Sequence, residues 1–239
     1  MSPATLELDL PHGVAVAVAV DAPDAAPRVA ATVPGRAPLD LDAALAALCA
    51  EERAHAAALT PVRRRDWVAR RCALRAAIAQ AGGAAPGPLL ADDRGAPVLP
   101  AGVLGSVSHK AGLAVALATG DGAAAGWRVG VDVEAVTGAR VDISRRILTD
   151  AELAEVAGLD GEARARAVAL RFSIKEAVYK AIDPFVRRYV GFREVAVWPG
   201  GGAVAAGVAT VDSALPVVVE AAWIELGDLW ICSARARAR

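Results

Sequence analysis

Apolar residues in this chain occur in short runs that polar residues interrupt. The most apolar run, residues 13–20, ends at Asp21, whereas a helix across a bilayer needs about 20 apolar residues. The sequence therefore predicts no membrane span. Apolar residues still make up 55% of the 239 residues, but aromatic residues make up only 4%. We expect a sizeable core built from many small side chains, chiefly alanine.

Opposite charges nearly cancel, with 26 Lys and Arg residues against 27 Asp and Glu residues and a net charge of −1. Because no excess positive charge is available, a nucleic-acid partner is not expected. The start of the chain has Glu7 and Asp9 but no Lys or Arg before Arg28. It lacks the basic start of a secretory signal, so we expect a cytoplasmic protein.

Three cysteines, odd in number and far apart, predict reduced packing residues rather than disulfides or a zinc site. They are Cys49, Cys72 and Cys232.

The order of predicted elements indicates an α+β protein in two halves, residues 1–125 and 126–239, separated by a glycine-rich stretch. The first half has a strand at 14–20, a loop at 21–38, helices at 40–59 and 61–81, and a hairpin of 106–109 with 113–118. The second half has a strand at 129–134, a short helix opened by Thr149, a long helix at 162–182 ended by Asp183-Pro184, and sheet strands at 195–198, 203–211, 216–224 and 229–232. No sequence repeat between the halves is evident. The closing Arg235, Arg237 and Arg239 are interpreted as a solvated tail.

Two carboxylates alternate with valine in the strand at 129–134. The period of two places Gly130, Asp132 and Glu134 on one face. Adjacent like charges are costly unless a cation lies between them, and Mg²⁺ prefers carboxylate oxygens. A lone Asp-x-Glu more often lies on an exposed strand whose acids pair with arginines. This motif alone therefore does not distinguish a metal site from such a strand.

A second cluster lies on the long helix. Lys175 and Lys180 are two of only three lysines among the 26 basic residues, and arginine does not replace a compact point charge, so we predict that both serve chemistry. Glu176 and Lys180 lie one turn apart, which also fits an ordinary ion pair. A third carboxylate near Asp132 and Glu134 would complete the protein share of a magnesium site, with Lys180 neutralising a phosphate. The pattern favours phosphoryl transfer.

Other cations have ordinary interpretations when taken alone. His109 ends a strand, where a histidine is more often structural or exposed. Five arginines on the helix at 61–81 fit a solvated face supported by nearby acids. They are Arg63, Arg64, Arg65, Arg71 and Arg75.

Together these motifs resemble the 4′-phosphopantetheinyl transferases, in particular the larger pseudo-dimeric type that activates nonribosomal peptide, polyketide and siderophore synthases. Gly130-Val-Asp132-Val-Glu134 is similar to the family's G-x-D-x-E metal motif, and Phe172-Ser-Ile-Lys175-Glu176-Ala-Val-Tyr-Lys180 is similar to its (F/W)-(S/C)-x-K-E-(S/A)-x-x-K motif. Gly105-Ser-Val-Ser108-His109 resembles an upstream S-x-S/T-H element, and Arg94-Gly95-Ala96-Pro97 resembles the segment along the nucleotide. The four elements occur in the family's order.

The resemblance implies two similar α/β halves related by a pseudo-twofold, coenzyme A (CoA) in the cleft between them, and a monomeric enzyme. It assigns Asp132, Glu134 and Glu176 to Mg²⁺, with Glu176 and Lys180 as the catalytic residues. The residues implied to bind CoA are Arg63, Arg71, Arg94, Gly95, Ala96, Ser108, His109 and Lys180. Arg70 stands where many members have a small or apolar residue, so whether Arg70 or Arg71 faces the ligand stays open.

The implied reaction transfers the phosphopantetheine arm of CoA to a serine of an apo acyl or peptidyl carrier protein and releases adenosine 3′,5′-bisphosphate. Two alternatives stay open. One is another magnesium-dependent phosphotransferase or nucleotidyl hydrolase. The other is a noncatalytic CoA-binding protein, which would have no need of the metal ligands.

Overall fold

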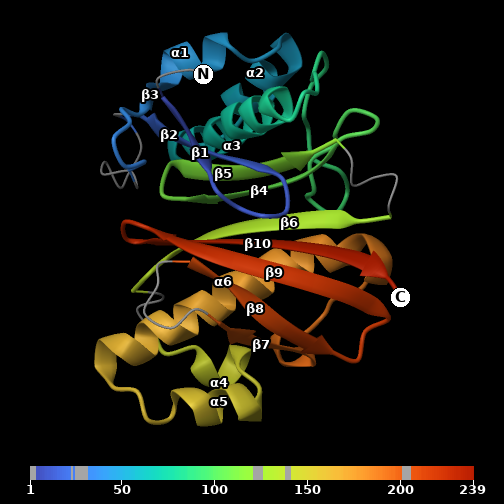
Figure 1. The fold of residues 1–239 in the computed structure, drawn as a ribbon. Coiled ribbons are helices and arrows are strands. Elements are labelled where there is room, and N and C mark those ends of the chain that lie inside the picture. Colours follow the sequence, from blue (N-terminus) through green and yellow to red (C-terminus); the bar gives the residue numbers. More distant parts are fainter. Residues whose placement is uncertain (1–3, 23, 25–31, 121–125, 138–140, 201–205) are drawn as a thin grey trace. The chain divides into compact units, whose positions relative to one another are not determined.

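The computed structural model describes residues 4–22, 24, 32–120, 126–137, 141–200 and 206–239. The chain forms two compact units, unit 1 with Met1–Asp9 and Gly13–Ala125, and unit 2 with Leu10–His12 and Gly126–Arg239. Each unit combines helices with a sheet (Figure 1), so the predicted mixture of α and β structure is confirmed. None of the described helices has both the length and the hydropathy needed to cross a bilayer.

Unit 1 packs a long helix on a five-stranded sheet (Figure 1), and buried apolar side chains form a core between them. The strand order is β1 (Thr5–Leu8), β2 (Val14–Asp21), β5 (Leu113–Thr119) and β4 (Leu104–Lys110), and β3 (Leu39–Asp40) pairs in parallel with β2. The helices are α1 (Leu41–Ala46), α2 (Ala50–Ala57) and α3 (Pro61–Gln80). The predicted β4–β5 hairpin is confirmed, and the start of α3 at Pro61 fits proline at the first helical position.

The single helix predicted over residues 40–59 is wrong, because α1 and α2 are separate helices. The Cys49 backbone N–H donates to the Glu52 carboxylate over 3.2 Å, which caps the start of a new helix. A buried side chain therefore decides this boundary, and the alanine-rich pattern does not reveal it.

Unit 2 also packs one long helix on an antiparallel sheet. The strand order is β6 (Arg128–Ala135), β10 (Leu229–Ala238), β9 (Val217–Leu226), β8 (Ala206–Ser213) and β7 (Val195–Pro199). The helices are α4 (Ser144–Ile147), α5 (Asp150–Val156) and α6 (Gly161–Val186), with a 3₁₀ turn, η1 (Phe192–Glu194). The helix α6 packs mainly on β6 and β10. Residues 203–205 of the predicted strand at 203–211 lie outside the described residues.

Two predicted ends in unit 2 are wrong. The helix α6 passes through Pro184 and ends before Arg187, which has a left-handed φ of 47°. Pro184 lies in the last turn of α6, where a proline removes only one helical hydrogen bond. The arginines at the end of the chain are not a solvated tail, because β10 continues to Ala238. Arg235 bonds Glu220 over 2.8 Å, and its guanidinium lies 4.4 Å from the centre of the Trp127 ring.

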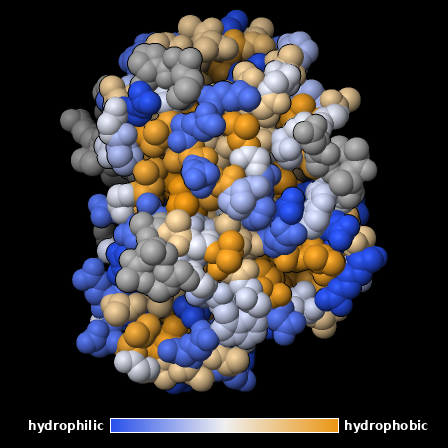
Figure 2. Space-filling model, in the orientation of Figure 1, coloured by the Kyte–Doolittle hydropathy of each residue, from blue (hydrophilic) through white to orange (hydrophobic). Residues whose placement is uncertain are grey.

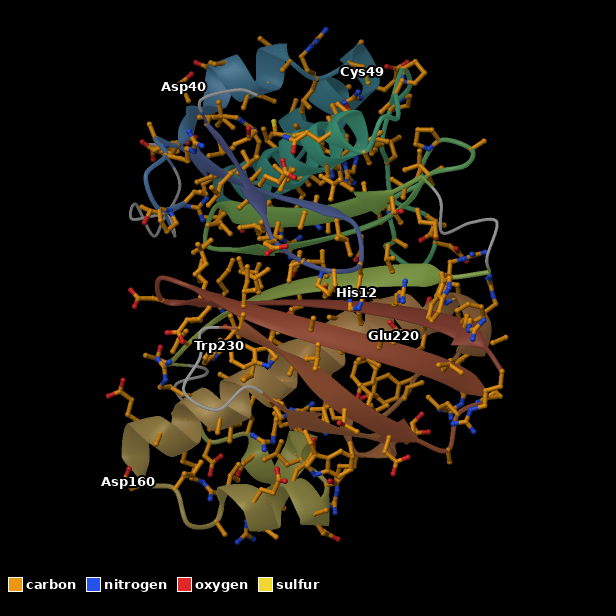
Figure 3. The ribbon with its side chains drawn as sticks, viewed as in Figure 1. His12, Asp40, Cys49, Asp160, Glu220 and Trp230 are labelled. Atoms are coloured by element: carbon orange, nitrogen blue, oxygen red, sulfur yellow. The ribbon has the colours of Figure 1, made fainter. Side chains whose placement is uncertain are left out.

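Residues 10–12 of the N-terminal region pack in unit 2. The His12 Nδ1 atom lies 2.9 Å from the Ser233 hydroxyl, and Figure 3 shows His12 beside the sheet that contains Glu220. Burial first, and then Arg235, lower the pKa of His12 to about 4, so this buried imidazole is neutral near pH 7.

Large exposed hydrophobic side chains are scattered along the described chain. They are Val62, Val98, Val141, Leu159, Tyr189, Val208 and Val218. On the face shown in Figure 2, hydrophilic residues interrupt the hydrophobic surface. Single exposed residues of this kind are normal on a protein surface and do not by themselves mark an interface.

Each unit contains a fully buried glutamate that ties its long helix to neighbouring segments. In unit 1, Glu52 pairs with Arg75 of α3 and accepts the Leu89 backbone N–H. In unit 2, Glu152 pairs with Lys175 of α6 and accepts the Val197 backbone N–H. Each glutamate also accepts the N–H three residues earlier in the chain, where its own short helix begins.

These contacts reveal an internal repeat that the sequence analysis did not detect. Glu52 and Glu152 are 100 positions apart, as are their partners Arg75 and Lys175. The match extends to Arg64, whose Nε donates to the Ala56 carbonyl, and to Arg164, which donates to the Val156 carbonyl. The helices α3 and α6 therefore correspond position by position over this stretch.

Gly130 lets β6 and α6 approach each other backbone to backbone. A Cβ atom at this position would lie 1.9 Å from the Ala177 carbonyl oxygen and 2.9 Å from the Ala181 nitrogen. Neither backbone atom can move without moving α6. The glycine of the G-x-D-x-E motif is therefore required for packing.

We predict that Gly130→Ala lowers the free energy of unfolding by about 1–3 kcal/mol or more, because it overpacks the contact between β6 and α6. Urea denaturation measures the change. Gly158→Ala is the matched control, since a Cβ there meets nothing within 4 Å. Equal stability of the two variants would show that α6 does not pack closely on Gly130.

Candidate active site

Three polar side chains meet where β6 lies against α6. The Lys180 Nζ atom donates to Asp132 Oδ1 over 2.9 Å and to the Val131 carbonyl over 2.8 Å. The Ser173 hydroxyl donates to the other carboxylate oxygen, Asp132 Oδ2, over 2.9 Å. Asp132 is only 6% exposed, and these bonds offset part of the cost of burying its charge. The structure thus brings Asp132 and Lys180 together.

Glu176 lies one helical turn before Lys180 and adds to an acidic neighbourhood. Its pKa is raised above 4.5, first because burial disfavours the charged form and next because Asp132 and Glu134 lie nearby. The Lys180 ammonium acts in the opposite direction. The three acids of the sequence prediction are therefore electrostatically coupled.

The donor chemistry of this neighbourhood fits a hard divalent cation, because carboxylate oxygens are the ligands that Mg²⁺ prefers. A cation would also offset the repulsion that raises the pKa of Glu176. Among the residues described, however, no group of three or more His, Cys, Asp or Glu side chains is arranged to hold a metal ion. Asp132 is bonded to Lys180 and Ser173. Magnesium binding at Asp132, Glu134 and Glu176 thus remains a prediction.

Lys175 does not lie in this neighbourhood, and the structure gives it a structural role instead of the predicted chemical one. Its ammonium donates to Glu152 Oε2 over 2.7 Å, to the Ile147 carbonyl over 2.7 Å and to the Phe192 carbonyl over 3.0 Å. The side chains of Lys175 and Glu152 are both 0% exposed. All three ammonium protons have acceptors, so Lys175 anchors α6 to the segments around it.

Ser108 and His109 lie on β4 in unit 1, next to the helix α3. The His109 Nε2 atom is 3.6 Å from Asp66 Oδ2 of α3, and the imidazole is exposed. Ser108 is buried, with 8% exposure. Arg63 is exposed near the start of α3. The structure therefore groups His109 with Asp66 of α3.

Arg71 is buried in unit 1, and its predicted contact with the nucleotide phosphates stays a prediction. It is 3% exposed, and its guanidinium lies 4.7 Å from the centre of the Trp67 ring. Burial lowers its pKa to about 10. Its equivalent in unit 2, Arg171, is buried as well. Arg70 is only half-buried, so it is the more accessible of the two neighbours that the sequence left open.

Arg94, Gly95 and Ala96 form an exposed turn around Asp92. The Asp92 carboxylate accepts the backbone N–H groups of Arg94 and Ala96, each over 2.9 Å. Gly95 has a φ of +84°, a conformation that glycine adopts without steric cost. The turn presents the Arg94 side chain on the surface of unit 1.

Two protein-family models match the chain, one in each unit. The 4′-phosphopantetheinyl transferase N-terminal domain matches residues 51–119, and the 4′-phosphopantetheinyl transferase superfamily matches residues 128–206. Together they match more than half of the chain. The chain belongs to the 4′-phosphopantetheinyl transferase superfamily.

A named relative is the 4′-phosphopantetheinyl transferase Svp of Streptomyces mobaraensis. It is 36% identical over 158 residues, a match that covers 64% of this chain and 62% of the relative. The match therefore spans less than two thirds of the relative's length.

Solved holo-(acyl-carrier-protein) synthases are similar to part of the chain. The Bacillus anthracis enzyme, in complex with CoA (3′,5′-ADP), is 22% identical, with 46% of this chain and 96% of that chain covered and a TM-score of 0.39. The Plasmodium yoelii enzyme is 16% identical, with 46% and 94% covered and a TM-score of 0.37. TM-scores this low do not establish a shared fold.

The sequence analysis missed the long-range contacts of two buried residues, Ser173 and Glu152. Ser173 stands in the quoted helix motif, but only the structure shows its bond to Asp132. Glu152 has a sequence signal as the third residue after Thr149, in a capping box that the structure contains. Its partner Lys175 lies too far along the chain for that local pattern to predict.

We predict that Lys175→Met lowers the free energy of unfolding by about 3–5 kcal/mol, because it leaves the Glu152 charge buried without its partner. Urea denaturation checks this value. The control is Arg193→Met, which breaks an exposed pair with Asp150 at 2.6 Å and should cost about 0–1 kcal/mol. Full stability with lost activity would instead restore a chemical role for Lys175.

We predict that Glu176 lowers the stability of the metal-free protein as the pH rises. Its pKa is raised in the folded state, so the folded state binds the proton more tightly than the unfolded state does. The stability from this group is complete below 4.5, its ordinary pKa, and is lost as the pH rises through the raised value.

Melting temperatures measured in EDTA across about pH 4–8 check this prediction. The wild-type melting temperature should fall with rising pH relative to that of Glu176→Gln. Glu162→Gln, at an exposed glutamate in the first turn of the same helix, should instead follow the wild type. Parallel profiles for the wild type and Glu176→Gln would contradict the prediction.

Proposed function

We propose that this chain is a 4′-phosphopantetheinyl transferase that moves the phosphopantetheine arm of CoA to a serine of an apo carrier protein. The observation that carries the proposal is the neighbourhood of Asp132, Glu176 and Lys180. These side chains lie within the residues that the superfamily model matches. The name of the Svp relative agrees with this activity.

In the proposed reaction, the carrier serine oxygen forms a bond to the phosphorus next to the pantetheine arm. The bond from that phosphorus to the bridging oxygen of the pyrophosphate breaks, and adenosine 3′,5′-bisphosphate leaves with the electron pair. Glu176 accepts the serine proton. This carboxylate lies one helical turn before Lys180, the residue proposed to contact the leaving phosphate.

Lys180 stabilises the charge on the leaving phosphate. Its ammonium has three protons, and in the described chain two of them go to Asp132 and to the Val131 carbonyl. The third is available for a phosphate oxygen. The side chain is 30% exposed, which leaves it accessible to a substrate.

Asp132, Glu134 and Glu176 are the residues that would hold Mg²⁺. When bound, the ion supplies charge neutralisation for the pyrophosphate. The proposal is supported by the donor chemistry and by the pKa of Glu176, which is raised first by burial and then by the nearby Asp132 and Glu134.

Unit 1 is proposed to bind the nucleotide part of CoA. The proposed contacts are Arg63, Arg94, Gly95, Ala96, Ser108 and His109, together with Arg71 or its neighbour Arg70. Exposure of Arg63, Arg94 and His109 supports this role, because a guanidinium or imidazolium contacts a phosphate only where the phosphate can reach it.

We also propose the larger, pseudo-dimeric type of the superfamily, with two similar halves in one chain. The repeat of Glu52 with Arg75 and of Glu152 with Lys175 supports two similar halves in one chain. Such a chain would act as a monomer in the cytoplasm on carrier domains of nonribosomal peptide, polyketide or siderophore synthases.

Intact-mass spectrometry of apo carrier domains incubated with the protein, CoA and Mg²⁺ tests the proposal. We expect the carrier to gain one phosphopantetheine group, with an equal amount of adenosine 3′,5′-bisphosphate released, and EDTA to stop the reaction. Asp132→Ala and Glu134→Ala should each lower kcat/KM by more than about 100-fold, as for other fixed charge-stabilising groups. Asp228→Ala, at an exposed acid on the turn between β9 and β10, is the control.

Other outcomes would contradict the proposal. Cleavage of CoA without modification of any carrier would indicate a hydrolase. Binding of CoA without turnover would indicate a noncatalytic protein. Activity near the wild-type level in Asp132→Ala would exclude Asp132 from the metal site.

A further inference from the structure

The Ser173 hydroxyl lies behind the candidate active site and takes no part in the chemistry proposed above. Ser173 is 0% exposed, and it donates to Asp132 Oδ2 over 2.9 Å. An ionised carboxylate only accepts hydrogen bonds, so the serine must be the donor. A serine inside a helix commonly bonds a carbonyl of the preceding turn. Ser173 instead bonds across to β6.

Cys232 of β10 is a fully buried neighbour of this hydrogen bond. Cys232 lies directly opposite Asp132 in the pairing of β10 with β6, and its side chain interacts with the Ser173 hydroxyl. Burial raises the pKa of the Cys232 thiol, so the sulfur keeps its proton and is a weak donor. A protonated thiol is only a weak acceptor, so the serine proton goes to the Asp132 carboxylate.

The repeat between the units provides an internal comparison. The unit 1 residue equivalent to Lys175 is also a cation, Arg75, which pairs with Glu52. The unit 1 residues equivalent to Ser173, Glu176 and Lys180 are Ala73, Ala76 and Gln80. Ser173 therefore differs between the units in the same way as the two residues proposed for chemistry.

From these observations we infer that Ser173 is the positioning residue for Asp132. The χ2 torsion of aspartate is broad, so an unheld carboxylate samples many orientations. The serine bond fixes Oδ2 and directs Oδ1 toward Lys180, so the carboxylate is already oriented for metal and substrate. This inference rests on the proposed function for the consequence to catalysis.

The test measures metal binding as well as transfer. Mn²⁺ binding is followed by electron paramagnetic resonance with CoA present, and transfer is followed by carrier mass. Ser173→Ala should weaken Mn²⁺ binding and lower kcat/KM for transfer by about 10–100-fold each, as for other groups that orient a metal ligand. Ser173→Cys keeps a weak donor of similar size and should give intermediate values.

Ser233→Ala is the matched control. Ser233 is also a 0% exposed serine of unit 2, and it bonds the His12 ring rather than Asp132. Its loss should leave Mn²⁺ binding and transfer at wild-type values. Melting temperatures show which variants are folded, and Ser173→Cys replaces Ser173→Ala in the comparison if the alanine variant is unfolded.

Wild-type Mn²⁺ affinity in a folded Ser173→Ala variant would overturn the inference, as would the absence of Mn²⁺ binding by the wild-type protein. A wild-type protein that transfers nothing, but loses Mn²⁺ affinity on Ser173→Ala, would refute the proposed function and support the role of Ser173. Equal weakening by Ser233→Ala would show a general packing effect and would also overturn it.

Discussion

The candidate site depends on the backbone contact between β6 and α6 at Gly130. A Cβ there would lie 1.9 Å from the Ala177 carbonyl oxygen, so a larger residue would move the helix outward. Ser173 and Lys180 both reach Asp132 from this helix over 2.9 Å. A displacement of about 1 Å would lengthen both contacts beyond hydrogen-bond range. The glycine of the motif therefore sets the distance between β6 and α6, and this distance lets Asp132 form its hydrogen bonds with Ser173 and Lys180.

A second constraint sets the rotation of α6 about its axis. Lys175 is held by Glu152 and by two backbone carbonyls in a fully buried network. Successive helical residues are about 100° apart, so fixing Lys175 also fixes the direction of its neighbour Glu176. A buried ion pair contributes little net stability compared with apolar packing, but breaking it is costly. Here the network fixes the orientation of α6 and makes no catalytic contact itself.

Local patterns were sufficient to predict much of this structure. Alternation predicted β6, and the predicted helix starts at residue 61 and at Thr149 match the starts of α3 and α5. The errors arose where distant residues decide the outcome, as at the break between α1 and α2, where Glu52 contacts Leu89. The repeat was missed because its identical residues, such as Glu52 with Glu152 and Arg64 with Arg164, are isolated positions in otherwise different sequences, and because Arg75 corresponds to Lys175. The bond from Ser173 to Asp132 joins residues 41 positions apart, beyond any local pattern.

The two lysines of α6 show how position decides what a rare residue does. Five residues along a helix correspond to a rotation of about 140°, so Lys175 and Lys180 point in different directions. Lys175 uses all three protons inside the protein, whereas Lys180 is partly exposed and bonds the acid of β6. In unit 1 the first position is Arg75, still paired with a buried glutamate, and the second is the uncharged Gln80. At the first position, both units have a cation that pairs with a buried glutamate. At the second position, only unit 2 has a cation, Lys180, and it bonds Asp132. This difference is expected if unit 1 retains the architecture while unit 2 supplies the acids and the lysine for phosphoryl transfer.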